Sequence, residues 1–282
     1  MGSDAVFSVP PWCSCSGGFA FMPLDIDRIL RETFVARAEY HPSLGSTNDR
    51  AAERAAQDGG ELPLLVAAER QTAGRGRAAN RWWTGPGALA FSLLVDGRSV
   101  DAHEGRSPLV ALAVATAIVD AVAPLLPQQP LGIHWPNDVF AAGRKLAGIL
   151  IEVLPNRRHI LGIGLNTNNS LADAPAELQA TAATLCDLCR QTCDQTDILV
   201  ALLKHLEHEF RHLCCQPQSV AARADALCLQ RGQLLTLQWA GRTVTGRCQG
   251  IAADGAILLE TPAGTEAFSS GTLLKSSREC HP

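Results

Sequence analysis

The pattern of apolar residues changes near residue 226, and this change divides the chain into two units. Between residues 40 and 213, apolar strand-like runs alternate with helical patterns. Between residues 226 and 275 only short strand-like runs occur, separated by tight turns at Ala240-Gly241, Asp254-Gly255 and Ala263-Gly264. Short strands joined by such turns are typical of a small β-barrel. The sequence therefore predicts a larger unit of helices and strands followed by a small all-β unit.

Local patterns predict the elements of both units. Helices are expected over residues 26–38, 46–60, 108–122 and 198–213. Ser46 or Thr47 can cap the second of these helices, and Gly59-Gly60 can end it. Strands are expected over residues 62–69, 88–95, 132–135, 145–154, 159–166, 233–239, 243–250, 256–260, 266–269 and 273–275. Turns at residues 142–144 and 155–157 favour an antiparallel meander in the larger unit.

Composition excludes several classes of protein. The 282 residues carry a formal net charge of −4, which argues against broad coating of nucleic acid or an anionic membrane. The longest strongly apolar run, Leu109 to Val119, is too short to span a bilayer. Residues 1–21 lack a basic start and a clean apolar core, so we interpret them as an extension and not as a signal peptide. The ten cysteines show no zinc-knuckle spacing, and we expect them to be reduced in a cytoplasmic protein.

A loop rich in glycine and arginine lies between two expected strands. The segment from Arg70 to Arg81 (RQTAGRGRAANR) contains four arginines and no acidic residue. Gly74 and Gly76 allow the backbone to expose its N–H groups, and Arg75 and Arg77 supply forked donors. The loop is therefore a candidate site for a phosphate or a carboxylate. A solvated surface loop and an RNA-binding segment are the alternatives.

A second candidate site follows an expected strand end. The sequence Trp135-Pro136-Asn137-Asp138 places an amide and a carboxylate on a turn, and Lys145 begins the next strand. A hairpin would bring these three groups to one mouth, where oxygen ligands could hold Mg²⁺ and the ammonium could contact a phosphate. An Asx-turn beside a surface lysine is the alternative.

Taken together and in this order, the motifs resemble the biotin–protein ligases. The resemblance covers about residues 40–275. It rests on Ser46-Thr47-Asn48, on Gln71 to Arg77 (QTAGRGR), on Trp82, on Trp135 to Asp138, on Arg144 to Leu150 (RKLAGIL) and on Gly162 to Asn166 (GIGLN). Each motif alone is weakly specific, whereas the ordered set is typical of this family.

The resemblance implies an α+β fold and a two-step reaction. The expected fold has a central mixed, mostly antiparallel sheet with helices, as in class II synthetases, followed by a small SH3-like β-barrel. The implied divisions are an N-terminal extension with a short helix (1–39), a biotin- and ATP-binding catalytic domain (40–224) and an SH3-like domain (225–282). Biotin would react with ATP to give biotinyl-5′-AMP. A lysine of a biotin carboxyl carrier domain, as in acetyl-CoA carboxylase, would then accept the biotinyl group.

The resemblance also implies roles for individual residues. Arg77, Lys145 and Asp138 are expected to be catalytic, and Asp138 and Asn166 to hold Mg²⁺. The implied biotin site contains Ser46, Thr47, Asn48, Gln71, Arg75, Gly76, Arg77 and Lys145. The implied ATP site contains Gly74, Arg75, Arg77, Trp82, Asn137, Asp138, Lys145 and Asn166. Trp82 would pack on adenine unless it is a core residue, and Ser46 or Thr47 could instead serve as a plain helix cap.

The chain departs from the family pattern at two places near the expected nucleotide site. Ala78-Ala79 stand where the family usually has Arg-Gly, and His134 replaces a lysine. Both changes remove positive charge. Residues 1–39 provide only one expected helix, so we expect the form of the family that lacks the N-terminal DNA-binding domain. Homodimerisation is left open.

Other signals remain outside this interpretation. A lipoate or octanoate ligase or transferase of the same superfamily is the enzymatic alternative, and a non-catalytic nucleotide- or RNA-binding module is another. His205, His208 and His212 share one helix, and Cys186, Cys189 and Cys193 follow a metal-like spacing. Neither set has an assignable further ligand, so we do not predict a metal centre from them.

Overall fold

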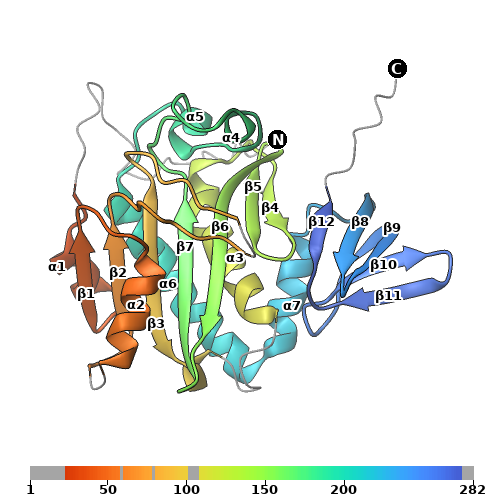
Figure 1. Ribbon diagram of the computed structural model, residues 1–282, viewed down its shortest axis with the longest axis horizontal. Helices are drawn as coiled ribbons and strands as arrows, with labels where there is room; N and C mark the ends of the chain where they lie inside the picture. The colour runs from red at the N-terminus through yellow and green to blue at the C-terminus, as the bar shows by residue number, and fades with distance from the viewer. Residues whose placement is uncertain (1–22, 58–59, 78–79, 101–107, 275–282) are drawn as a thin grey trace, which may run out of the picture.

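The computed structural model of the chain describes residues 23–57, 60–77, 80–100 and 108–274. The predicted extension (1–21), the helix stop at Gly59, the Ala78-Ala79 departure and the strand end at Lys275 lie outside the described residues. The described elements form a large body and a small C-terminal body (Figure 1).

A seven-stranded sheet forms the centre of the large body, in the order β1-β2-β3-β7-β6-β5-β4. All of its neighbouring pairs are antiparallel except β1 and β2, which are parallel. This confirms the prediction of a mixed, mostly antiparallel sheet. The strands are β1 (Arg37–His41), β2 (Leu64–Ala68), β3 (Leu89–Asp96), β4 (Leu131–His134), β5 (Asp138–Ala141), β6 (Arg144–Val153) and β7 (Arg158–Leu165).

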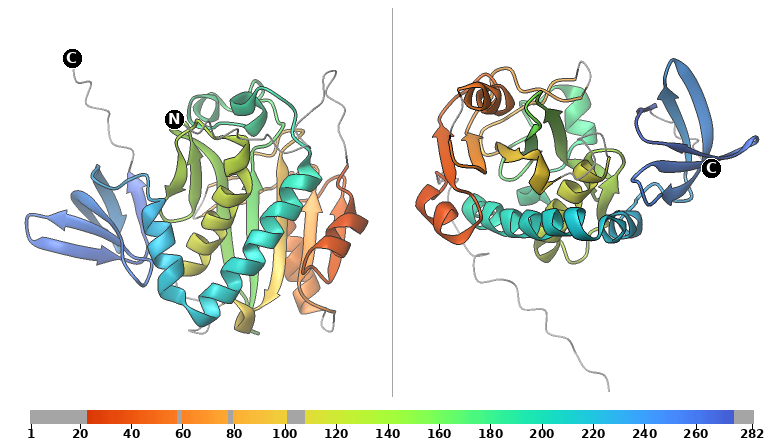
Figure 2. Two further views of the ribbon diagram at one scale, coloured as in Figure 1. Left: turned by 180° about the vertical axis from the view of Figure 1, so that it is seen from behind. Right: turned by 90° about the horizontal axis from the view of Figure 1, so that it is seen from below.

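Helices cover both faces of this sheet (Figures 1 and 2). α3 and α6 lie side by side on one face, and α2 lies on the other. Strand β2 is buried on both sides, because Leu65 and Ala67 join the main core while Leu64 and Val66 pack beneath α2. The helices are α1 (Ile26–Glu32), α2 (Thr47–Ala56), α3 (Leu109–Val122), α4 (Ala176–Thr181), α5 (Leu185–Cys189), α6 (Gln195–Cys215) and α7 (Pro217–Ala226).

The first predicted helix is too long, and β1 takes its last two residues. Helix α1 ends at Glu32, whereas the prediction extended it to residue 38. Residues 37–41 pair with β2 instead, and Ala36 N–H already donates to the Pro63 carbonyl oxygen at 3.0 Å. Pairing with a distant strand thus overrides the local pattern. The predicted boundary between residues 39 and 40 falls inside this strand.

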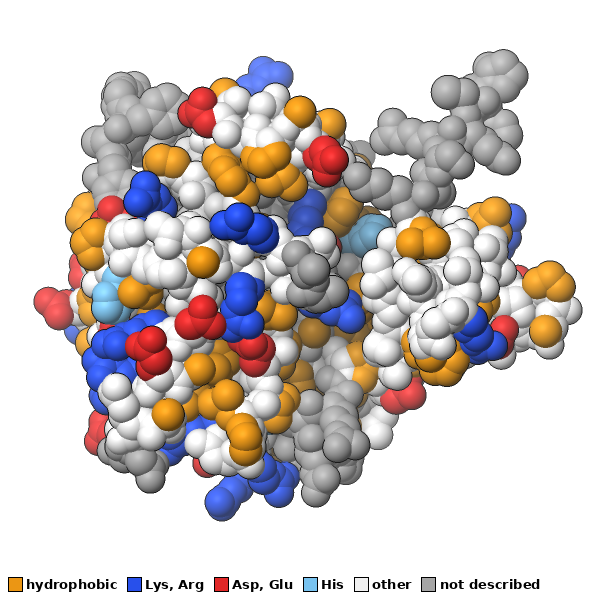
Figure 3. All heavy atoms as spheres, in the orientation of Figure 1, with side chains coloured by type: hydrophobic (Ala, Val, Ile, Leu, Met, Phe, Trp, Pro, Cys, Tyr) orange, Lys and Arg blue, Asp and Glu red, His pale blue; other side chains and the backbone are white. Residues whose placement is uncertain are grey.

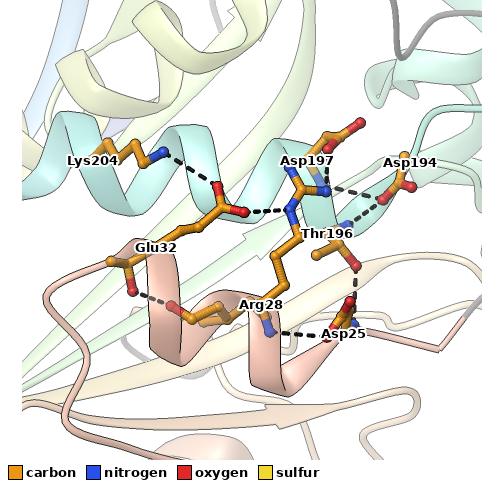
Figure 4. A network of polar contacts seen from close by, with 9 residues as sticks. Asp25, Arg28, Glu32, Asp194, Thr196, Asp197 and Lys204 are labelled. Carbon is orange, nitrogen blue, oxygen red and sulfur yellow. Dashed lines mark hydrogen bonds and ion pairs between the residues drawn. The ribbon is translucent and has the colours of Figure 1, made fainter.

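Polar contacts fix α1 to α6 (Figure 4). Arg28 Nη1 lies 2.6 Å from Asp197 Oδ1, and Lys204 Nζ lies 3.4 Å from Glu32 Oε2. The Asp25 N–H donates to Thr196 Oγ1 at 3.1 Å. Helix α1 therefore belongs to the packed body.

The small body is a five-stranded antiparallel sheet in the order β11-β10-β9-β8-β12. All five predicted strands are present: β8 (Leu234–Trp239), β9 (Arg242–Ile251), β10 (Ile257–Thr261), β11 (Gly264–Phe268) and β12 (Thr272–Leu274). The fully buried Trp135 ties this sheet to the large body, because its indole N–H donates to the Gly255 carbonyl at 3.0 Å. Its backbone N–H donates to Gln230 Oε1 at 2.7 Å. Among the described helices, none has the length and apolarity needed to cross a membrane.

Candidate active site

A cavity of about 430 Å³ opens where the two bodies meet, a volume suited to a small-molecule ligand. Its floor is formed by β6 and β7, and its rim by the Gly/Arg loop, the turn between β4 and β5 and the start of β12. On this face, Lys and Arg side chains gather around the middle of the large body, next to the small body (Figure 3).

Glycines on the floor make room for two predicted site residues. Gly148 of β6 is paired with Gly164 of β7, and the Trp82 indole lies across both. A Cβ on Gly148 would lie 2.9 Å from Trp82 Cζ3, and a Cβ on Gly164 would overlap the same ring. A Cβ on Gly162 would likewise overlap the Asn48 amide. The sequence therefore needs glycine here so that Trp82 and Asn48 can lie directly on the sheet.

A buried polar network forms one end of the cavity. Gln71 Oε1 accepts hydrogen bonds from the Thr47 N–H at 2.9 Å and from the Thr47 hydroxyl at 3.1 Å. Ser92, which is fully buried, lies 2.7 Å from Thr47 Oγ1 and 2.6 Å from Asn48 Oδ1. Ser46 is at the N-cap of α2, but its side chain makes no capping hydrogen bond among the described residues. These groups offer donors and acceptors close together.

Arg75 is held by two carboxylates. Its guanidinium donates to both oxygens of Glu152, at 2.9 and 2.8 Å, and to Asp49 Oδ1 at 2.7 Å. The hydrogen bonds to Glu152 raise the pKa of Arg75 above its usual range. Glu152 Oε2 also accepts from Asn48 Nδ2 at 2.5 Å. Glu152 thus joins the polar network to the Gly/Arg loop.

Arg77 is positioned by an amide. Its Nη1 donates to Asn137 Oδ1 at 3.2 Å, and Asn137 Nδ2 in turn donates to the Ile149 carbonyl at 2.7 Å. Burial lowers the pKa of Arg77, while the nearby Asp138 carboxylate acts in the opposite direction. A half-buried guanidinium on an amide partner retains its charge for an anionic ligand.

Lys145 lines the same cavity as Arg77. Its Nζ lies 2.8 Å from Asp138 Oδ1 and 5.8 Å from the centre of the Trp82 ring. A register shift at Val139/Phe140 in the β5–β6 pairing lies beside this pair. His134 stacks on Phe140 at 4.4 Å, and burial lowers the pKa of His134, which favours its neutral form. Two cations and one carboxylate therefore meet at this end of the cavity.

The cavity includes most of the residues predicted from the sequence. The predicted residues that line it are Ser46, Thr47, Asn48, Gln71, Arg75, Gly76, Arg77, Trp82, Asn137, Asp138 and Lys145. Two predicted residues lie elsewhere. Gly74 borders a neighbouring hollow behind the loop, and Asn166 is buried, with its Oδ1 accepting from Asn169 Nδ2 at 3.2 Å.

Several residues of the site were not predicted. Ser92 and Glu152 complete the polar network, and residues 271–273 of the small body line the cavity. The sequence could have indicated Glu152, because it is an acidic residue at the end of a largely apolar strand. No local pattern could have indicated residues 271–273, because only the packing of the two bodies brings them to the cavity.

The two residues predicted to bind metal lie in different surroundings. Asp138 is paired with Lys145, and Asn166 is not among the residues that line the cavity. Within the described ranges, no group of three or more His, Cys, Asp or Glu side chains is arranged to hold a metal ion. A Mg²⁺ site that uses Asp138 and Asn166 stays a prediction.

Comparison with known proteins agrees with this site. Residues 40–168 match the Biotin/lipoate A/B protein ligase family, and residues 235–274 match the Biotin protein ligase C terminal domain. The Biotin--[acetyl-CoA-carboxylase] ligase of Mycobacterium tuberculosis is 33% identical over 261 residues, which cover 89% of this chain and 96% of the relative. The Bifunctional ligase/repressor BirA of Bacillus subtilis is 29% identical, with 83% and 72% covered.

Solved structures show the same fold. The biotin protein ligase from Aquifex aeolicus in complex with biotin and ATP superposes with a TM-score of 0.75 at 24% identity, covering 85% of this chain and 99% of that structure. The fold and the site define a ligase with a catalytic α+β body and a small β body. The chain belongs to the biotin protein ligase family.

Proposed function

We propose that this enzyme activates biotin with ATP to biotinyl-5′-AMP and transfers the biotinyl group to a lysine of a biotin carboxyl carrier domain. The observation that carries the proposal is that Arg77 and Lys145 line one cavity together with the polar network at Thr47 and Gln71. Biotinyl-5′-AMP carries a bicyclic urea at one end and a mixed carboxyl–phosphate anhydride further along. The urea needs hydrogen-bond donors and acceptors, and the anhydride needs cations.

The polar end is proposed to bind the ureido ring of biotin. A urea has two N–H donors and one strong carbonyl acceptor, so it needs both acceptors and donors in its pocket. Thr47 and Gln71 supply both, and the buried Ser92 holds Thr47 in place. Ser46, Asn48 and Gly76 line the same cavity. The Trp82 indole lies across Gly148 and Gly164, with its ring centre 5.8 Å from Lys145 Nζ, and is proposed to pack on the adenine of ATP.

The cationic end is proposed to bind the reacting groups. The carboxylate oxygen of biotin attacks the α-phosphorus of ATP, the bond to the bridging oxygen breaks, and pyrophosphate leaves. Negative charge grows on the phosphate oxygens, and Arg77 and Lys145 are placed to stabilise it. One cation about 4 Å from a unit negative charge contributes about 4 kcal/mol at an effective dielectric of about 20, before desolvation costs.

The second step is proposed to use Asp138. An amine attacks an acyl-adenylate only when it is neutral. Asp138 is partly exposed at the cavity and already binds an ammonium, that of Lys145. It is therefore suited to orient the carrier lysine and to receive its proton. The lysine nitrogen bonds to the biotin carbonyl carbon, and AMP leaves with the electron pair of the acyl–phosphate bond.

Further assignments belong to the same proposal. Arg75, Gly74, Asn137 and Asn166 remain proposed nucleotide-site residues; Asn166 would act through its hydrogen bond with Asn169. Mg²⁺ would enter as the counter-ion of the ATP phosphates. A carrier domain of acetyl-CoA carboxylase or a related carboxylase is the proposed partner. The cytoplasmic location and the homodimer stay predictions.

A transfer assay tests the function. The full chain is incubated with ATP, biotin and a purified carrier domain, and streptavidin blotting detects biotin on the carrier. A carrier whose acceptor lysine is changed to arginine serves as the control. We expect ATP-dependent labelling of the lysine form alone. Labelling of the arginine form, or no labelling at all, would overturn the proposal.

A further inference from the structure

Two cysteines at the junction of α5 and α6 lie in contact with each other. Cys189 is the last residue of α5, and Cys193 stands two residues before the start of α6. Their sulfur atoms lie 3.6 Å apart and share a hydrogen bond. Arg190, at the C-cap of α5, is left-handed with a φ of 57° and turns the chain between them. Bonded sulfurs lie about 2.0 Å apart, so a movement of about 1.6 Å would allow a disulfide.

The surroundings of the two thiols give them different properties. Cys189 is partly exposed, whereas Cys193 is buried. The hydrogen bond with Cys193 lowers the pKa of Cys189 below its usual range, although burial acts in the opposite direction. The thiolate is the attacking form in thiol–disulfide exchange, and the attack needs access to the reagent. Cys189 is therefore suited to attack a reagent from solvent, and Cys193 is suited to attack the product formed on Cys189.

The chain around these thiols is bonded to residues of the proposed active site. Helix α5 lies at the end of the sheet where β7 ends (Figure 1). Just before α5, the Ala183 N–H donates to the Lys145 carbonyl oxygen at 2.8 Å. After α5, the Cys193 N–H donates to Asn168 Oδ1 at 2.9 Å, and Asn168 Nδ2 donates to the Cys193 carbonyl oxygen at 2.8 Å. A movement of the turn between α5 and α6 would therefore pull on the segment that follows Asn166 and on the start of β6.

We propose that Cys189 and Cys193 form a site of thiol–disulfide exchange that takes a low-molecular-weight disulfide as its reactant, and that their disulfide slows adenylation. The effect on adenylation rests on the proposed function. The Cys189 thiolate attacks one sulfur of the reactant and expels its first thiolate. Cys193 then loses its proton to solvent, attacks the Cys189 sulfur and expels the second thiolate. Two protein thiols are thereby oxidised to one disulfide, and the reactant is reduced to two thiols.

Peptide mapping tests the exchange site. The full chain is treated with glutathione disulfide, the remaining thiols are alkylated, and the chain is digested with trypsin. Cleavage after Arg190 separates the two cysteines into peptides 159–190 and 191–204. Only a disulfide can then keep these peptides joined, and the chain that carries it should run as a monomer on a non-reducing gel.

Three variants assign the thiols. Cys189→Ser should abolish the joined peptides, because it removes the attacking thiol. Cys193→Ala should stop at the mixed disulfide, which mass spectrometry detects as one glutathione bound to Cys189. The matched control is Cys186→Ser, which changes the other cysteine of α5 and should keep the joined peptides.

Biotin-dependent pyrophosphate exchange tests the effect on adenylation. A misplacement of about 1 Å in an active site can cost about 100-fold in rate. For wild type and for Cys186→Ser, we therefore expect treatment with glutathione disulfide to slow pyrophosphate exchange about tenfold or more, and dithiothreitol to restore it. For Cys189→Ser, we expect the wild-type rate before treatment and no change after it.

The possible failures are distinguishable. If the peptides are not joined in wild type, or are joined equally in Cys189→Ser, the exchange site is overturned. If they are joined and pyrophosphate exchange keeps its rate, the effect on adenylation is overturned while the proposed function stands. If the reduced wild type shows no pyrophosphate exchange with biotin, the proposed function fails and the effect on adenylation fails with it, whereas the peptide map still decides the exchange site.

Discussion

Replacing Gly164 with alanine should expel Trp82 from the floor of the cavity. Gly164 lies on β7, opposite Gly148 on β6, and the Trp82 indole rests on both. The added methyl group would overlap the ring at Gly164, whereas at Gly148 it would lie 2.9 Å from Trp82 Cζ3. A β7 residue in the middle of a sheet cannot move far, so the tryptophan and its loop must give way.

The cost of this substitution follows from overpacking. Extra methylene groups in a packed site cost about 1–3 kcal/mol. We expect that loss as a lower free energy of unfolding in urea, or, where the loop moves aside, as a roughly 5- to 150-fold weaker affinity for biotin. Gly148→Ala should show a smaller loss. Gly45→Ala, whose methyl group meets nothing within 4 Å, is the matched control.

A double-mutant cycle isolates the cause. In a Trp82→Ala background the methyl group of Gly164→Ala has no indole to overlap, so its effect should nearly disappear. Urea unfolding and biotin titration are measured for the two single variants, the double variant and wild type. An equal cost of Gly164→Ala with and without Trp82 would refute the packing argument.

Three further predictions concern charged groups. Arg77→Gly should speed the escape of biotinyl-AMP by about one to two orders of magnitude, since one charge-assisted contact is lost; an unchanged dissociation rate in stopped flow would count against the phosphate role. Lys145→Ala should slow single-turnover adenylation far more than it lowers the melting temperature, because ion pairs that solvent reaches contribute only about 0–1 kcal/mol to stability and the pair with Asp138 is partly exposed. A large loss of melting temperature with normal turnover would reverse the assignment. Burial raises the pKa of Glu209, whose Oε2 has no hydrogen-bond partner among the described residues. The folded state therefore favours the protonated side chain. The folded protein is most stable below the unfolded-state pKa of Glu209, and it loses stability as the pH rises through the folded-state pKa. Glu209→Gln should therefore gain stability over wild type in urea titrations as the pH rises above about 4.3, the ordinary pKa of a glutamate, and a gain that does not grow with pH would contradict this sign.

The sequence predicted most of the fold because the local patterns were strong. Helix α3 is apolar on nearly every side, and the turns of the small body mark each of its strands. The exceptions are elements that depend on distant partners. Strand β1 exists because residues 37–41 pair with β2, and no local pattern could show that partner. Short helices such as α4 and α5 are too short for a periodic signal.

The site was predicted as motifs but not as a network. Arg77, Asp138 and Lys145 each belong to a recognisable segment, and the fold brings them to one cavity. Glu152 contacts Asn48, which is 104 positions away in the sequence, and Arg75, which is 77 positions away. Only the packing of β6 against α2 and the Gly/Arg loop brings these residues together. The same holds for the approach of residues 271–273.

Biotin-dependent exchange of labelled pyrophosphate into ATP tests the central claim most directly, because it requires the carboxylate and the α-phosphate to react between Arg77 and Lys145. The account predicts exchange with biotin, none with lipoate, and severe loss in the Arg77→Gly and Lys145→Ala variants. Exchange supported equally by lipoate, or undiminished when both cations are removed, would contradict it.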